Sequence, residues 1–137
     1  MVILDTDVLS EAMRSDSVAL AWLDRQPWTS VWTTTITIFE IRLGLIMMPA
    51  GRRRALKLVE FERVLEEDLE RRILPFDTVA AEQAAVLMGN RRRAGRLVDS
   101  RDTMIAGIAL AQRATLVTRN LRHFADLNVA VVNPWNQ

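Results

Sequence analysis

The chain has 137 residues, enough to bury a core of its own, and we expect a single domain over residues 1–137. It contains no cysteine, which excludes disulfides, thiolate metal sites and cysteine nucleophiles. No apolar run approaches the roughly 18 residues that a membrane span requires, and the first residues do not form a basic-then-apolar leader. We therefore expect a soluble, cytoplasmic protein that has no membrane partner.

The net charge is +1, so overall charge indicates no class of partner. The distribution says more, because 18 residues are basic, Lys57 is the only lysine, and the arginines cluster at 52–54 and 91–101. Arginine suits bidentate contacts with phosphate. An equally good explanation is that the excess of arginine over lysine reflects genome base composition and that both clusters are merely solvated ends of helices. The second cluster comprises Arg91, Arg92, Arg93, Arg96 and Arg101.

The apolar residues 2–4 open the chain and are followed at once by Asp5. This pattern predicts a buried parallel strand that delivers Asp5 to its carboxyl end, the edge of an open α/β sheet where ligands bind. A short helix is predicted over 8–14, and Thr6 or Asp7 is suited to cap it. The alternative is that Asp5 and Asp7 act only as helix caps.

The next elements are a helix, a strand and another helix. Ser15 or Asp16 is suited to cap a helix that Pro27 stops, and the β-branched residues 31–35 predict a second strand. The apolar period then becomes helical up to Met48. Glu40 falls near the start of this third helix, just past the carboxyl end of the second strand. The helix dipole alone would favour an acid there.

Helices and short strands continue to alternate in the second half. Asp77 or Thr78 is suited to cap the fifth predicted helix, and Pro75 indicates that the strand before it lies at an edge of the sheet. We expect helices over 52–72, 78–93 and 100–111, and strands over 73–76, 115–117 and 129–132. This alternation predicts an α/β fold, a three-layer α/β/α sandwich with a five-stranded, mainly parallel sheet.

The helix that begins near residue 100 is small and apolar from Met104 onward, so it should be buried. Asp102 lies in its first turn, where an unpaired carboxylate would cost several kcal/mol unless a cation, donors or water meet it. Asp99, three residues earlier, is suited to cap this helix or to share the same cleft.

Three carboxylates, those of Asp5, Glu40 and Asp102, thus map to one edge of the sheet. Such a cluster is sensible only if a cation offsets the mutual repulsion. Because there is no cysteine and a single histidine, the ligands would be oxygens, which suits Mg²⁺ or Mn²⁺ better than Zn²⁺. A site of this kind catalyses phosphodiester or phosphomonoester chemistry. Further oxygen ligands would be Asp7, Asp99 and the Asn120 amide.

Four motifs occur in order: LDTDVLSE at the start, ITIFEIRLG around Glu40, DSRDTMIAGIA around Asp102, and TRNLRHF after the fourth strand. In this combination the chain resembles PIN-domain endoribonucleases, specifically the VapC-type toxins of toxin-antitoxin pairs. The segments ILPFD and VVNPW resemble the FitB-like branch of that family.

The resemblance implies a strand order of 3-2-1-4-5 and a type II toxin that cleaves RNA with Mg²⁺, for which Mn²⁺ can substitute. It implies Asp5, Glu40 and Asp102 as the catalytic, metal-binding acids, with Thr118 and Asn120 lining the site. It also implies a homodimer held by helices and a small antitoxin that occludes the site, with a larger assembly of both as a further option.

The chain departs from the family pattern at three positions. Asp7 stands where the family more often has asparagine, and the places of the family's fourth acid hold Asn120 and His123. We therefore expect one tightly held ion and a weaker second ion that is supplied with the substrate. Asp7 or Asp99 can take the place of the missing fourth acid as a ligand of this second ion. His123 itself is expected to be a surface residue of a loop.

The resemblance also suggests where partners bind. The second arginine cluster, from Arg91 to Arg101, is expected to hold RNA phosphates. The antitoxin helix would lie in a groove lined by Ile38, Leu45, Met47 and Met48, although these residues equally suit a core or a dimer interface.

Two other functions remain open. Asp5-Thr6-Asp7 matches the Asp-x-Asp opening of haloacid-dehalogenase-like phosphatases, with Asp5 as nucleophile and Thr35 as a further site residue, but Lys57 is the only lysine and lies in the wrong element. The missing fourth acid also allows a catalytically weak PIN-like module that binds RNA or protein.

Overall fold

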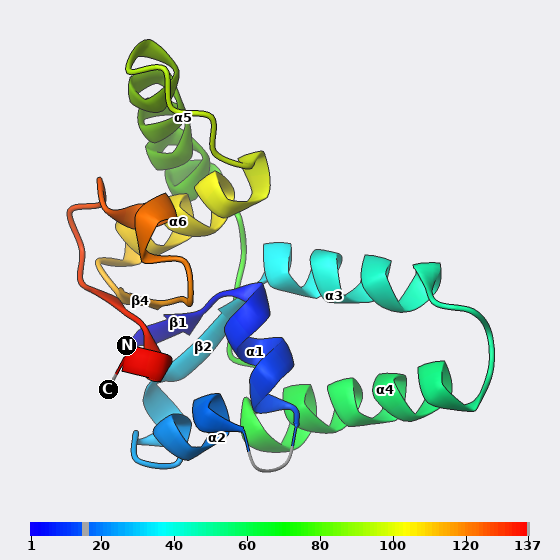
Figure 1. Cartoon of the computed structure of the whole chain (residues 1–137). Helices are drawn as coiled ribbons and strands as arrows, with labels where there is room; N and C mark the ends of the chain where they lie inside the picture. Colours follow the sequence, from blue (N-terminus) through cyan, green and yellow to red (C-terminus); the bar gives the residue numbers. More distant parts are fainter. Residues whose placement is uncertain (15–16, 137) are drawn as a thin grey trace.

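The computed structural model describes residues 1–14 and 17–136 (Figure 1). At its centre, five strands are ordered β3-β2-β1-β4-β5, and each neighbouring pair is parallel. The predicted order is confirmed, and β3 lies at an edge as Pro75 indicated. The strands are β1 (Val2–Leu4), β2 (Val31–Thr34), β3 (Ile73–Leu74), β4 (Thr115–Val117) and β5 (Val131–Val132).

The helices in the described part of the chain are α1 (Thr6–Ala12), α2 (Val18–Leu23), α3 (Thr35–Met47), α4 (Arg52–Arg63), α5 (Thr78–Arg93) and α6 (Ser100–Gln112). The helix predicted over 52–72 is shorter, because α4 passes into a π-helical turn, Val64–Asp68. Single 3-10 turns occur at Trp28–Ser30, Leu121–Phe124 and Pro134–Asn136.

The helices cover both faces of the sheet, and alternate side chains of the central strands point to opposite faces. Leu4 and Val117 are buried in a core that includes residues of α1, α2, α3 and α4. Ile3 and Leu116 are buried on the other side against α5 and α6. The three-layer α/β/α arrangement expected from the alternation of elements is therefore confirmed.

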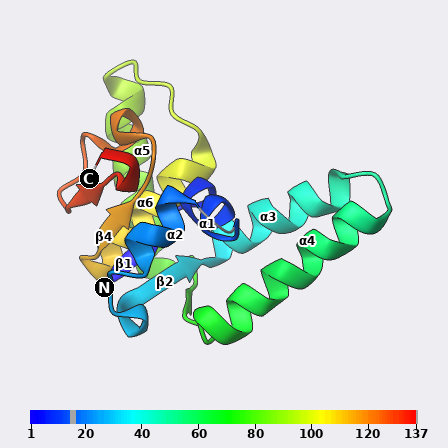
Figure 2. The ribbon, with the colours of Figure 1, turned by 60° about the horizontal axis from the view of Figure 1, so that its bottom comes forward.

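The helices α3 and α4 project from the body as an antiparallel arm (Figure 2). Large apolar side chains remain exposed along it, among them Ile46, Met47 and Val59. Among the described residues, no helix has the length and apolar character needed to cross a membrane.

The pair α5 and α6 packs closely at Gly107. A Cβ atom there would lie 2.6 Å from the backbone oxygen of Ala80 and 2.7 Å from the Cβ of Ala84. Both distances are below van der Waals contact, so only glycine lets α6 approach α5 in this way. This packing sets the position of α6 relative to α5, and with it the position of Asp102.

The helix caps differ in part from those expected. Asp5 itself caps α1, and α1 begins at Thr6, so the prediction that Thr6 or Asp7 would cap a helix starting near Val8 was wrong. A carboxylate placed directly after the strand reaches the first free N–H groups of the helix, leaving no residue between strand and helix. The expected caps Ser15 and Asp16 lie outside the described residues, while Ser17 caps α2. Asp77 and Asp99 cap α5 and α6 as expected.

Candidate active site

A polar cavity of about 180 Å³ opens at the carboxyl edge of the central strands. It receives side chains from the turn between β1 and α1, from α3, from the start of α6 and from the loop after β4. Five of its residues are acids, and the structure thus brings together the acids that the sequence placed at this edge. The cavity is lined by Asp5, Thr6, Asp7, Glu40, Asp99, Asp102 and Asn120.

Asp5 is the most buried of these acids, with 4% of its surface exposed. One carboxylate oxygen accepts a hydrogen bond from the backbone N–H of Val8 at 3.0 Å, and the other accepts one from the Thr118 hydroxyl at 2.5 Å. Burial raises the pKa of Asp5 to about 6, and the two hydrogen bonds only partly offset this. Asp7 and Asp102 raise the pKa further by repulsion. Thr118, expected to line the site, therefore acts by orienting Asp5.

Glu40 lies on α3 and faces α1. Its carboxylate accepts a hydrogen bond from the Thr6 hydroxyl at 2.7 Å. Arg101 lies on the other side, with its Nε atom 3.7 Å from Glu40 and 3.4 Å from Asp99. Glu40 is thus held between a neutral donor and a cation at the rim of the cavity.

Asp102 lies in the first turn of α6, as predicted, and is partly buried. Burial raises its pKa above the usual range, while His123, whose Nδ1 lies 3.2 Å from the carboxylate, counteracts this. His123 is 48% exposed, so it is a surface residue, but it also borders the site. Asp99 caps α6 by accepting a hydrogen bond from the Arg101 N–H at 2.8 Å, which lowers the pKa of Asp99.

The donor set fits a hard divalent cation, because it consists of carboxylate and amide oxygens without thiolates. Within residues 1–14 and 17–136, no three Asp, Glu or His side chains already surround one point at which an ion would fit. Each of the three predicted acids instead turns to a donor: Asp5 to Thr118, Glu40 to Thr6, and Asp102 to His123.

A family model described as PIN domain matches residues 2–129 of this chain. The chain belongs to the PIN domain family. The VapC ribonuclease Y4jK of Sinorhizobium fredii is 35% identical to it over 137 residues, covering 98% of both chains. Toxin FitB of Neisseria gonorrhoeae is 32% identical over 138 residues, covering 99% of both. The crystal structure of FitAcB from Neisseria gonorrhoeae superimposes with a TM-score of 0.84 at 31% identity and covers all of both chains. The resemblance to VapC-type and FitB-like proteins is therefore confirmed.

The arginine cluster of this PIN domain divides in the structure. Arg91 is 1% exposed, and its guanidinium binds the Asp126 carboxylate, the Thr103 hydroxyl and the backbone oxygen of His123. The prediction that Arg91 contacts RNA phosphate is wrong, because a buried guanidinium that already donates four hydrogen bonds within the protein cannot reach RNA. The sequence spacing could have indicated that Arg91 is buried, because Arg91 falls on the same helical face as Ala80, Ala84 and Leu87.

The other members of the cluster remain accessible to different extents. Arg96 is paired with Asp126 at 3.0 Å, and one of its nitrogens also donates to the backbone oxygen of Arg122. Arg92 and Arg93 are exposed at the end of α5. Of the five arginines, only Arg101 forms ion pairs with residues of the acid cavity.

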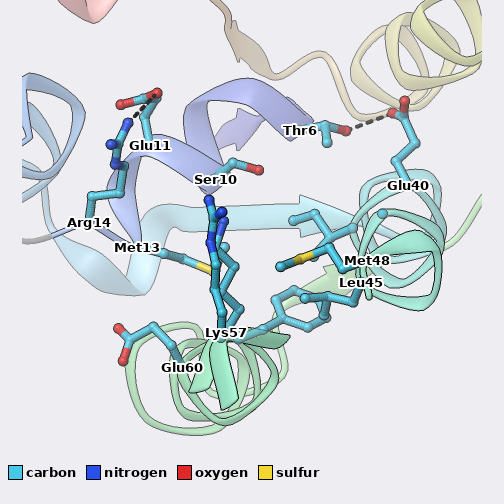
Figure 3. A pocket seen from close by; sticks show the side chains of 14 residues that line it. Thr6, Ser10, Glu11, Met13, Arg14, Glu40, Leu45, Met48, Lys57 and Glu60 are labelled. Carbon is cyan, nitrogen blue, oxygen red and sulfur yellow. Dashed lines mark hydrogen bonds and ion pairs between the residues drawn. The ribbon is translucent and has the colours of Figure 1, made fainter. Parts of the chain in front are cut away.

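A larger groove of about 670 Å³ lies between α1, α3 and α4, and Thr6 and Glu40 border both this groove and the acid cavity (Figure 3). Leu45, Met48 and Phe61 form apolar parts of its wall. Of the four residues expected to line a partner groove, Leu45 and Met48 do so, whereas Ile38 and Met47 do not. Met47 points outward and is 75% exposed.

The structure does not favour the phosphatase alternative. Lys57 lines this groove on α4 and not the acid cavity, so no lysine is available beside Asp5. Thr35 is exposed, and its hydroxyl accepts a hydrogen bond from the N–H of Phe76.

Proposed function

We propose that this PIN domain is an endoribonuclease that requires Mg²⁺, or Mn²⁺ in its place, and that it is the toxin of a type II toxin-antitoxin pair. The observation that carries the proposal is the cavity in which Asp5, Glu40 and Asp102 meet at the carboxyl edge of the sheet. The similarity to a VapC ribonuclease and to Toxin FitB over the whole chain supports it.

Asp5, Glu40 and Asp102 would hold the ion, with Asp7 and Asp99 available for a weaker second one. A bound divalent ion lowers the pKa of a water molecule and offsets the charge that develops on the phosphodiester. The residues of the chain prepare this site in advance: Thr118 and the N–H of Val8 hold the Asp5 carboxylate in one orientation. Thr6 holds the Glu40 carboxylate in the same way, through a hydrogen bond of 2.7 Å.

Arg101 stands at the rim of the cavity and would contact an RNA phosphate there, because it is half exposed and close to Glu40. The Asn120 amide lines the cavity and is suited to bind the phosphate or an ion. Arg92 and Arg93 remain proposed contacts with more distant phosphates, because both are exposed.

The test is cleavage of a mixed RNA panel by the purified protein with Mg²⁺, with Mn²⁺ and with EDTA. We compare the wild type with Asp102→Asn and with Asp24→Asn, a matched loss of one exposed carboxylate outside the cavity. We expect cleavage that needs the metal, falls by about 100-fold or more in Asp102→Asn and is unchanged in Asp24→Asn. Full metal-dependent activity of Asp102→Asn would disprove the site. RNA binding without turnover in every buffer would favour the catalytically weak binding module.

The groove between α1, α3 and α4 would hold a segment of the antitoxin. Its apolar wall suits the apolar face of a helix, and Glu11, Arg53, Lys57 and Glu60 supply charges of both signs around it. Because Thr6 and Glu40 border both cavities, a segment seated in the groove would also block access to the acids. We expect Leu45→Lys to abolish inhibition by the cognate antitoxin while RNA cleavage by the free protein persists.

We also propose a homodimer in the cytoplasm, with a larger assembly once the antitoxin binds. Exposed apolar side chains on α3 and α5, such as Phe39, Val79 and Val86, support an interface between helices. Light scattering should give twice the mass of one chain for the free protein, and a monomer at all concentrations would contradict this.

A further inference from the structure

A second polar cavity, of about 300 Å³, adjoins the acid cavity. Asn120 lines both, and His123, which lines the second, has its Nδ1 3.2 Å from the carboxylate of Asp102. The volume lies at the lower end of the roughly 300–1,000 Å³ range of small-ligand pockets. The two cavities are therefore neighbours along the carboxyl edge of the sheet. The polar residues of the second are Arg119, Asn120, Arg122, His123, Asn133 and Asn136.

The lining of this second cavity is basic. It contains two arginines, a histidine and three amides, and its described lining residues include no carboxylate. In the described part of the chain, neither Arg119 nor Arg122 forms an ion pair with a carboxylate, whereas Arg91, Arg96 and Arg101 all do. Two arginines that line one polar cavity and form no ion pair in the described part of the chain favour an anion as the occupant.

The cavity is also held in shape by contacts between the loop after β4 and the C-terminal turn. The guanidinium of Arg119 lies over the ring of Trp135, 4.4 Å from its centroid, which limits the conformations of this arginine. The Asn133 amide donates to the backbone oxygen of Arg119 at 3.3 Å, and the Trp135 N–H donates to Asn133 at 2.9 Å. Binding would thus require little ordering of these residues.

The neighbouring acid cavity creates an electrostatic need for such a site. Five carboxylates repel the phosphates of RNA, and a bound divalent ion carries only two positive charges against them. A basic cavity directly beside the acids would retain the next phosphate along the strand while the scissile one lies at the ion. Arginine and amide donors are also the groups that proteins use to bind single-stranded RNA.

We propose that the cavity formed by Arg119, Arg122 and Asn136 binds the phosphate of the nucleotide adjoining the scissile phosphodiester, and so sets the position of the RNA strand. The inference rests on the proposed nuclease function, because it names a part of the same substrate. Arg119 and Arg122 are here binding residues and take no part in the chemical step.

The test measures RNA binding separately from cleavage. Fluorescence anisotropy with short, labelled, random-sequence single-stranded RNA in EDTA reports binding while the proposed metal-dependent reaction is off. We compare the wild type with Arg119→Gln/Arg122→Gln. The control is Arg25→Gln/Arg113→Gln, which loses the same two positive charges at exposed residues. These two residues precede β2 and β4, so they lie toward the amino edge of the sheet and away from the cavity.

We expect the cavity variant to bind RNA about tenfold or more weakly, and the slope of log K against log salt to become flatter by about 0.7, the change for one lost phosphate contact on a single strand. The control should lose at most about twofold, through net charge alone. Asn136→Asp, which places a carboxylate in the cavity without removing an arginine, should weaken binding as well. Equal losses in the cavity and control variants would overturn the inference, as would unchanged binding in the cavity variant or no binding by the wild type.

Kinetics then separate this inference from the proposed function. If the wild type cleaves RNA, the cavity variant should raise KM by about tenfold and leave kcat within about twofold. Cleavage by the wild type with an unchanged KM in the cavity variant would overturn the inference and leave the nuclease intact. If the wild type binds RNA through this cavity but does not cleave it in any metal, the proposed function fails and the binding site stands.

Discussion

Asp5 has two tasks that conflict when no cation is bound. It caps α1 and points into a cavity of acids, and burial raises its pKa to about 6 from 3.8. Since the folded state favours the protonated form, the stabilisation from Asp5 is fully present below the unfolded pKa and is lost as the pH rises through 6. A shift of about two pKa units corresponds to up to about 3 kcal/mol, so ionised Asp5 destabilises the metal-free fold above that pH.

We therefore predict that Asp5→Asn stabilises the metal-free protein. An asparagine retains the cap on α1 but carries no charge, so at about pH 7.5 in EDTA the free energy of unfolding should rise by about 1–3 kcal/mol. Below about pH 3, where Asp5 is protonated in both the folded and the unfolded state, the gain should vanish. Urea denaturation at both pH values measures this.

The control for this prediction is Asp5→Ala, which removes the charge and the cap together. It should be about 1 kcal/mol less stable than Asp5→Asn. A loss of stability in Asp5→Asn at neutral pH would show that the ionised carboxylate is tolerated and that no cation is needed to offset it.

At the scale of helices, the position of Asp102 depends on how α6 packs against α5. We predict that Gly107→Ala destabilises the fold by about 1–3 kcal/mol, because the new Cβ would lie 2.6 Å from the backbone oxygen of Ala80. Gly44→Ala is the matched change in α3, where a Cβ meets nothing within 4 Å, and it should stabilise the fold by up to about 1 kcal/mol. Thermal melts of both variants measure these changes in stability. Stabilisation by Gly107→Ala would mean that α5 and α6 are less closely packed than the structure shows.

The buried Arg91 ties α5 to α6 and to the turn Leu121–Phe124 through Asp126, Thr103 and the backbone of His123. We predict that Arg91→Met costs about 2–4 kcal/mol, because the Thr103 hydroxyl and the His123 backbone oxygen lose their donor and Asp126 keeps only its ion pair with Arg96. Arg92→Met, its exposed neighbour, should stay within about 0.5 kcal/mol of the wild type. Equal stability of the two variants in urea would show that the Arg91 network contributes little.

For the molecule as a whole, the sequence was sufficient to predict the sheet and the gathering of acids. β1 is a short apolar run and β2 is rich in β-branched residues, and each leads almost directly into a helix, so Asp5 and Glu40 had to reach the same edge once the strands were parallel. Asp102 was identifiable as the one acid in the first turn of a helix that is apolar from Met104 to Ala111. Local patterns suffice where the signal lies within one element.

Features that depend on distant partners could not be predicted in this way. The burial of Arg91 needs Asp126, which lies 35 residues away along the chain, and a run of three arginines otherwise indicates an exposed helix end. The contact of His123 with Asp102 and the stacking of Arg119 on Trp135 likewise join separate loops. The projecting arm of α3 and α4 follows from the path of the chain after Met48, which no periodic pattern specifies.

Anomalous diffraction from crystals grown with Mn²⁺ would show whether the acid cavity holds a metal ion. We predict a strong manganese peak bounded by Asp5, Glu40 and Asp102, and its absence in crystals of Asp5→Asn. A peak only elsewhere on the molecule, or an empty cavity in protein that cleaves RNA under the same conditions, would contradict the assignment.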